Sequence, residues 1–297
     1  MWRVAVTAPG SFLSGVGNAL SCALLPSCCS LCGSFLPRLS ETPVCESCWG
    51  EVSGNREHCC ARCGEDLFEP VTGAAVRDCR ACRTAPPAFV RMVSAGVYEG
   101  AMRHAIQAFK YDRMSALAPE LGRRLAEAIA TMAADAPREM LVVAVPLHRE
   151  RMAQRGFNQA RLLASEAIRI LATRHPAWQL ELSSRMLVRQ RSTESQAGLT
   201  PRQRRLNLRG AFLVSDPEAV RGRHVLLVDD IYTTGATARA CSLVLAEAGA
   251  ASVRVATLAR AQRRFPMPLH DEGDFMKLRI AEGAGEGLPP SKTTTVH

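Results

Sequence analysis

The sequence HVLLVDDIYTTGAT, residues 224–237, joins an apolar run to two acidic residues and a hydroxyl-rich turn. Residues 225–228 are apolar and mostly branched, which is typical of a strand covered on both faces of a parallel sheet. Asp229 and Asp230 stand at the carboxyl end of that strand, and a helical pattern over residues 239–247 follows the turn. The segment therefore predicts a strand, a polar loop and a helix in an α/β fold.

The loop after this strand has the chemistry of a phosphate site. It consists of Thr233, Thr234, Gly235, Ala236 and Thr237. Backbone N–H groups and the positive dipole end at a helix N-terminus hold phosphate, Gly235 permits close approach, and the hydroxyls add donors. Asp229 and Asp230 are acceptors that suit vicinal ribose hydroxyls, and a bound Mg²⁺ would reinforce the arrangement. Together these features predict a ribose 5-phosphate site.

The common phosphate-binding motifs of other folds do not occur in the chain. It has no GxxxxGK[ST] loop and no GxGxxG sequence after a strand. An Asp-rich turn that caps an ordinary helix is the plain alternative. The ordered combination of strand, acidic pair and Thr/Gly loop favours the ribose 5-phosphate site over that alternative.

Positive charge is concentrated in the middle of the chain. The net charge is +9, and residues 138–210 contain fourteen arginines, no lysine and five acidic residues. A solvated face is the ordinary reason for such arginines. Arginine in place of lysine favours forked contacts to phosphate oxygens, either of pyrophosphate or of nucleic acid.

The twelve cysteines indicate metal binding in a cytoplasmic protein. Residues 1–21 contain one basic residue and are interrupted by proline and glycine, so we do not expect a signal peptide. We also expect no membrane span, because no stretch is long and apolar enough. In the reducing cytoplasm, paired cysteines bind metal more often than they form disulfides.

Four CxxC pairs lie between residues 29 and 82 and predict two structural Zn²⁺ sites, since two pairs supply four thiolates. The expected ligands are Cys29, Cys32, Cys45, Cys48, Cys60, Cys63, Cys79 and Cys82. Consecutive pairing closes the shorter loops, whereas a cross-braced arrangement is the alternative. A redox CxxC is a further alternative. The four leftover cysteines, Cys22, Cys28, Cys59 and Cys241, are expected to be bystanders or buried apolar residues.

Composition divides the chain into four parts. We expect an N-terminal segment over 1–25, a double zinc ribbon over 26–85, a larger α/β domain over 88–264 and a disordered tail over 265–297. Within the α/β domain the sequence predicts strands over 89–98, 140–145, 211–214 and 253–258, and helices over 101–110, 117–132 and 160–171. This alternation favours a parallel sheet flanked by helices, with the ligand at the carboxyl ends of its strands.

Several motifs carry a family resemblance. The 224–237 stretch resembles the 5-phosphoribosyl-1-pyrophosphate (PRPP) signature of type I phosphoribosyltransferases. FKYD at 109–112, VPLHRERMAQRGFNQA at 145–160 and RSTESQAGLTPRQRRLNLRGAF at 191–212 resemble the ComF family, as does the double zinc ribbon in front. The resemblance covers roughly residues 22–262.

This resemblance implies particular roles. Asp229 and Asp230 would orient the ribose of PRPP, with Mg²⁺, and residues 233–237 would hold its 5-phosphate. Leu147, His148 and Arg149, with Arg155, would form the pyrophosphate side, and residues 191–200 would be a mobile lid. The RGFNQ block is also a plain helix start with Asn158 as its cap.

Two functions follow from the resemblance. One is transfer of ribose 5-phosphate to an unknown amine-type acceptor. The other is binding of single-stranded DNA with the competence machinery, with or without a response to PRPP. A glutamine-dependent amidophosphoribosyltransferase is not expected, because the chain has no room for a glutaminase domain.

Overall fold

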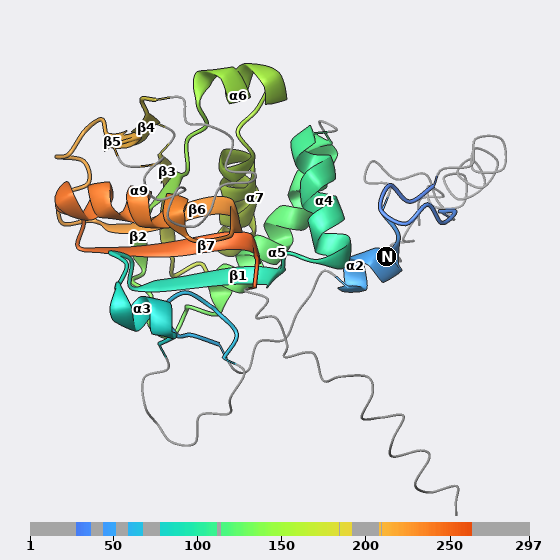
Figure 1. Cartoon of the computed structure of the whole chain (residues 1–297), viewed down its shortest axis with the longest axis horizontal. Helices are drawn as coiled ribbons and strands as arrows, with labels where there is room; N and C mark the ends of the chain where they lie inside the picture. The colour runs from blue at the N-terminus through green and yellow to red at the C-terminus, as the bar shows by residue number, and fades with distance from the viewer. Residues whose placement is uncertain are drawn as a thin grey trace, which may run out of the picture. The chain divides into compact units, whose positions relative to one another are not determined.

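Strand β6, residues His224–Tyr232, lies in the middle of a parallel sheet. The computed structural model describes residues 28–36, 44–51, 59–67, 78–111, 114–183, 185–191, 208 and 210–262. Its five-stranded sheet has the order β1-β7-β6-β2-β3, and every neighbouring pair is parallel. The predicted parallel sheet flanked by helices is confirmed (Figure 1).

The strands and helices alternate along most of the chain. The remaining strands of the sheet are β1 (Arg91–Val97), β2 (Glu139–Ala144), β3 (Gln179–Ser183) and β7 (Ser252–Arg260). The helices are α2 (Glu46–Glu51), α3 (Arg80–Thr84), α4 (Gly100–Tyr111), α5 (Ala118–Ala130), α6 (Arg149–Arg155), α7 (Gln159–Arg174) and α9 (Ala236–Glu247). A 3₁₀ turn, η1 (Ser115–Leu117), precedes α5.

The segment predicted as a strand over 211–214 does not enter the main sheet. It forms β5 (Phe212–Val214), which pairs antiparallel with β4 (Leu187–Arg189) in a separate two-stranded sheet. Helix α6 and strands β3 and β4 were not predicted, because each is short and has no clear apolar period. The predicted lid lies outside the described residues except for Arg191, and residues 1–25 and 265–297 lie entirely outside them.

Alternate residues of each central strand pack into two separate hydrophobic cores, one on each face of the sheet. Leu226 and Val228 of β6 join a core with α4, α5 and α7, whereas Val225 and Leu227 join a core with α9. This alternation is the period of two that a strand imposes, and both faces are apolar because helices cover both. Figure 1 shows α9 on one side of the sheet and α5 with α7 on the other.

The two cysteine clusters belong to opposite cores. Cys29 and Cys48 are buried with the core of α4, α5 and α7. Cys60, Cys63, Cys79 and Cys82 are buried with the core of α9. The second cluster also reaches the edge of the sheet, where the Met92 N–H donates to the Arg62 carbonyl at 2.8 Å.

Candidate functional site

The acidic pair lies at the carboxyl end of β6, as the parallel sheet requires. Asp229 is in register with Thr257 of β7, and the Asp230 N–H donates to Asp229 Oδ1 at 2.9 Å. Asp230 Oδ2 lies 2.8 Å from Lys110 Nζ, and both side chains are 13% exposed. Lys110 thus places a largely buried positive charge next to the two acids. This lysine belongs to the FKYD motif, which by itself predicted no role for it.

The two carboxyl groups differ in their surroundings. Burial and the neighbouring charge of Asp230 raise the pKa of Asp229 to about 7, and Lys110 opposes this rise. Near neutral pH, Asp229 is therefore close to its midpoint of ionisation. Groups with strongly shifted pKa values in a cleft are typical of functional sites.

The loop after β6 has the backbone expected of an anion site. Gly235 has a φ of +74° and is the residue before the first turn of α9, where a side chain would be strained. The Ala236 N–H donates to Thr234 Oγ1 at 3.4 Å. The N-terminus of α9 and these hydroxyls lie together at the carboxyl edge of the sheet, which is where α/β folds bind ligands.

A cavity of about 630 Å³ connects this loop to the segment after β2. Six residues predicted for the site line the cavity: Leu147, Arg155, Asp229, Asp230, Thr233 and Thr237. His148, Arg149, Thr234, Gly235 and Ala236 are not among the residues that line it. His148 instead precedes α6, where its Nδ1 accepts from the Glu150 N–H at 3.5 Å.

Three further basic residues, none of them predicted for the site from the sequence, also line the cavity. They are Lys110, Arg151 and Arg189, which with Arg155 give four cations against the two aspartates. Burial and then the charge of Arg151 lower the pKa of Arg189, so these positive charges face one another. A polyanion in the cavity would relieve that repulsion. None of the three has a local signal in the sequence: Arg151 lies in a helix of seven residues, Arg189 ends a strand of three residues, and Lys110 is the last residue but one of α4.

The RGFNQ block shapes the wall of the cavity. Asn158 Oδ1 accepts from the Arg161 N–H at 3.1 Å, and its Nδ2 donates to the Val145 carbonyl at 3.0 Å. The predicted cap role of Asn158 is therefore confirmed. Arg155 donates to Gln159 Oε1 at 3.1 Å and lies 5.4 Å from the Tyr111 ring centre.

Gln159 has a buried, unpaired amide donor beside the cavity. The residue is 1% exposed and lines the cavity, and its Nε2 has no hydrogen-bond partner among the described residues. Leaving a buried amide donor unpaired costs about 1–3 kcal/mol.

The eight predicted metal ligands form two groups. The sulfurs of Cys29, Cys32, Cys45 and Cys48 lie within 4.8 Å of one another, as do those of Cys60, Cys63, Cys79 and Cys82. Consecutive pairs thus come together, as predicted. Zn–S bonds of about 2.3 Å in a tetrahedron separate sulfurs by about 3.8 Å, and the Cys63–Cys79 sulfur distance is 3.7 Å.

Backbone donors around the sulfurs also fit zinc. The Cys45 N–H donates to Cys29 Sγ at 3.3 Å, and the Cys79 N–H donates to Cys60 Sγ at 3.2 Å. Such N–H to sulfur bonds stabilise thiolates in metal knuckles. The clusters therefore suit two structural zinc ions, with each cluster offering four sulfur ligands and no open position.

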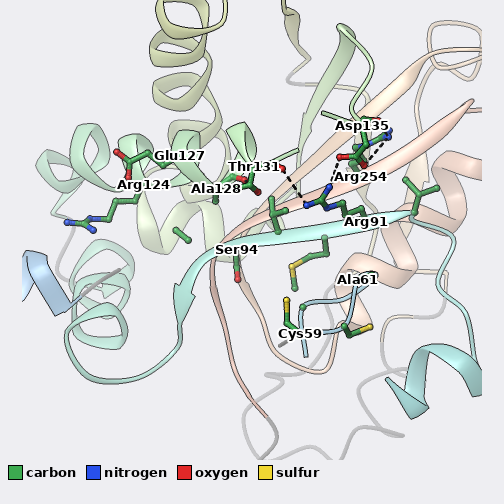
Figure 2. A pocket seen from close by; sticks show the side chains of 16 residues that line it. Cys59, Ala61, Arg91, Ser94, Arg124, Glu127, Ala128, Thr131, Asp135 and Arg254 are labelled. Carbon is green, nitrogen blue, oxygen red and sulfur yellow. Dashed lines mark hydrogen bonds and ion pairs between the residues drawn. The ribbon is translucent and has the colours of Figure 1, made fainter. Parts of the chain in front are cut away.

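A second cavity, of about 790 Å³, lies between β1, α5 and the second cysteine cluster (Figure 2). Each of its charged groups already has an ionic partner. Figure 2 shows Arg91 and Arg254 meeting Asp135, with N–O distances of 2.5 and 3.9 Å. The smaller cavity, with its surplus of cations, is the better site for a polyanion.

Comparisons with known proteins agree with this geometry. The family described as "Phosphoribosyl transferase domain" matches residues 156–284. The "DNA utilization protein YhgH" of Salmonella typhi is 33% identical over 80% of this chain and 98% of its own length. The "Competence protein F" of Haemophilus influenzae is 29% identical over 75% of this chain and 93% of its own length.

The "Competence protein ComFC" of Bacillus subtilis is 29% identical over 74% of this chain and 85% of its own length.

None of the helices in the described part of the chain combines the length and apolar character needed to cross a bilayer. The parallel sheet, the phosphoribosyltransferase domain match and the nearly full-length relatives show that this chain belongs to the ComF family.

Proposed function

We propose that this chain binds PRPP in the 630 Å³ cavity and transfers its ribose 5-phosphate to an amine-type acceptor, with release of pyrophosphate. One observation carries the proposal. A single cavity contains an acidic pair, the two ends of a phosphate loop and four basic side chains. PRPP has the matching set of groups, namely vicinal ribose hydroxyls, a 5-phosphate and a diphosphate.

Each part of the cavity suits one part of PRPP. Asp229 and Asp230 accept hydrogen bonds from the ribose hydroxyls. The loop 233–237 holds the 5-phosphate at the N-terminus of α9. Arg155, with Arg151 and Arg189, contacts the diphosphate, because planar guanidinium groups bind phosphate oxygens in pairs.

The reaction then depends on positioning and on stabilisation of the leaving group. The bond from the anomeric carbon to pyrophosphate breaks with its electron pair on the leaving pyrophosphate, the bond to the amine nitrogen forms, and the amine loses a proton to water. The arginines offset the charge that develops on departing pyrophosphate. The aspartates fix the sugar so that its anomeric carbon faces the acceptor. Mg²⁺ bound with PRPP would neutralise diphosphate charge, and the oxygens of Asp229 and Asp230 are ligands that it prefers.

The test is PRPP binding by the double variant Asp229→Asn, Asp230→Asn. Calorimetric titration of wild-type protein with PRPP and Mg²⁺ should show one site per chain. The double variant should show no measurable binding, because amides offer one acceptor oxygen in place of two and carry no charge. Unaltered PRPP affinity in the double variant would contradict the assignment.

The single variant Asp229→Asn gives a further test, of stability rather than of binding. The pKa of Asp229 is raised to about 7, so its ionisation opposes folding between pH 4 and 7. Near pH 4, the Asp229→Asn variant should be as stable as wild type. As the pH rises to 7 it should become more stable than wild type, and above pH 7 this difference should stay constant. Melting temperatures across this range measure the gain. A variant less stable than wild type at pH 8 would contradict the expected gain in stability.

A second candidate function is binding of single-stranded DNA in competence. It is favoured by the relatives named for competence and DNA utilization and by the arginine surplus over residues 138–210. Contacts to a phosphate backbone release counterions, so affinity should fall steeply with salt. Fluorescence anisotropy with labelled single-stranded DNA at several salt concentrations measures this. An affinity that does not change with salt would exclude backbone contact.

A further inference from the structure

A buried arginine ties the second cysteine cluster to the carboxyl end of β7. Arg260 is 2% exposed, and its Nε donates to the Cys63 carbonyl at 2.7 Å. Its Nη2 donates to the Glu65 carboxylate at 2.5 Å, and Glu65 is 5% exposed. Both acceptors belong to the segment that carries two of the four thiols. The arrangement of that segment therefore fixes where the guanidinium lies.

The same guanidinium is held against the last residue of β6. The Arg260 guanidinium carbon lies 5.2 Å from the centre of the Tyr232 ring, and Tyr232 is 4% exposed. The Ala261 N–H donates to the Tyr232 carbonyl at 2.9 Å, and Phe89 packs its ring edge-on against Tyr232. A cation over an aromatic face in a buried site restricts both groups. Tyr232 thus has little freedom while Arg260 stays in place.

Tyr232 in turn lies under the phosphate loop. A Cβ atom added at Gly235 would come within 2.1 Å of the Tyr232 hydroxyl oxygen, so the phenol touches the loop backbone. The Gly235 carbonyl accepts from the Arg239 N–H at 2.8 Å, which is the first turn of α9. The position of the phenol therefore limits where the loop and the helix N-terminus can settle.

We propose that the second cysteine cluster, when it holds its metal, positions the 5-phosphate loop through Arg260 and Tyr232. These two are positioning residues and do not contact the phosphate. The role of the loop as a phosphate site rests on the proposed function. Without the metal, the Cys63 carbonyl loses its fixed place, Arg260 loses its anchor, and Tyr232 no longer supports Gly235.

The first cluster provides a matched comparison. Arg124 donates to the carbonyl of Trp49, the residue after Cys48, at 2.6 Å, and this cluster packs into the opposite core. Cys29 and Cys48 pack with α4, α5 and α7, on the face of the sheet opposite to α9. Loss of the first metal should therefore leave the loop unchanged.

The experiment measures amide hydrogen exchange, residue by residue, in wild type, Cys82→Ser and Cys48→Ser, each with its zinc content determined. The probes are the Ala236 and Arg239 amides, whose hydrogen bonds lie in the loop and the first turn of α9. We expect their exchange to accelerate by about tenfold or more in Cys82→Ser and to stay within about twofold of wild type in Cys48→Ser. Equal effects of the two variants, or no effect of Cys82→Ser, would overturn the proposal.

A second variant keeps the test decisive if Cys82→Ser does not fold. Tyr232→Phe removes the hydroxyl next to Gly235 and leaves both clusters intact. With two zinc ions still bound, it should accelerate the same amides by about threefold to tenfold. Unchanged exchange in Tyr232→Phe would overturn the role of Tyr232.

These readouts need no ligand, so they are separate from the test of PRPP binding. Wild-type protein that exchanges as expected but does not bind PRPP would support the positioning role and contradict the proposed function. If wild-type protein binds PRPP but neither Cys82→Ser nor Tyr232→Phe changes the amide exchange of the loop, the proposed function would be supported and the positioning role contradicted.

Discussion

The two cysteine clusters use the same pair of CxxC motifs in different surroundings. In the first cluster, Cys32 is exposed and Cys45 is half-buried. In the second cluster, all four thiols are buried, and the least buried of them, Cys79, is 7% exposed. The same metal chemistry can therefore support a peripheral knuckle or an integral part of a core.

The difference extends to the arginine that joins each cluster to the sheet domain. Arg260 and Glu65 form an ion pair whose side chains are 3% and 7% exposed. Arg124 pairs with Glu120 at 3.3 Å, where the side chains are 8% and 25% exposed, and Glu120 has a second partner in Arg123. The second cluster is thus held by a buried ion pair, and the first by a network in which Glu120 has two arginine partners.

The largest expected difference is between Arg260→Met and Arg124→Met. Arg260→Met leaves the buried Glu65 carboxylate without its guanidinium, which should lower the free energy of unfolding by about 3–5 kcal/mol. Arg124→Met leaves Glu120 paired with Arg123, so the loss should be about 1–2 kcal/mol. Urea unfolding of the zinc-loaded proteins measures both. Equal losses would show that burial does not distinguish the two clusters.

The partner variant Glu65→Leu tests the origin of the larger loss. In the double variant Arg260→Met, Glu65→Leu no buried charge is left unpaired, so most of the lost stability should return. A double variant no more stable than Arg260→Met alone would mean that the guanidinium contacts with Cys63 and Tyr232 are the main source of stability.

The next prediction concerns the rate of metal loss. With a chelator in excess, one zinc ion should leave at least about ten times faster than the other, because the first cluster is partly exposed and the second needs a local opening of the core. A colorimetric zinc indicator follows both phases. In Cys48→Ser the fast phase should be missing. A fast phase that persists in this variant would reverse the assignment.

Sequence patterns predicted the parts of the molecule that depend on local chemistry. The apolar run 225–228 predicted β6, and the CxxC spacing predicted both sulfur clusters with consecutive pairing. The acidic pair and two threonines of the loop come together in one cavity with Leu147 and Arg155. These patterns succeed because strands, knuckles and loops are each formed by residues that are close in sequence.

The rest depends on contacts between distant residues. Arg260 ends an apolar strand and meets Cys63, which lies 197 positions earlier in the chain. Lys110 and Asp230 form their ion pair from two different elements, α4 and β6. Helix α6 has seven residues and is capped at its C-terminus by Gly156, whose φ is +81°. No periodicity marks such a short helix, and none identifies the partner of a single charged residue.

The smallest expected effect is a difference in thiol reactivity between the two clusters once a chelator has removed the metal from both. A hydrogen bond with the Ser34 side chain lowers the pKa of Cys32 to about 6, whereas hydrogen bonding with Cys60 raises the pKa of Cys63 to about 11. Cys32 is then mostly thiolate at pH 7. Because a less basic thiolate is also a weaker nucleophile, the alkylation rate of Cys32 should exceed that of an ordinary thiol by only about twofold to threefold. The rate should fall as pH drops through 6, and Ser34→Ala should move that midpoint upward. Mass spectrometry after brief iodoacetamide treatment identifies the labelled cysteine, and preferential labelling of Cys63 would contradict the ranking of the two clusters.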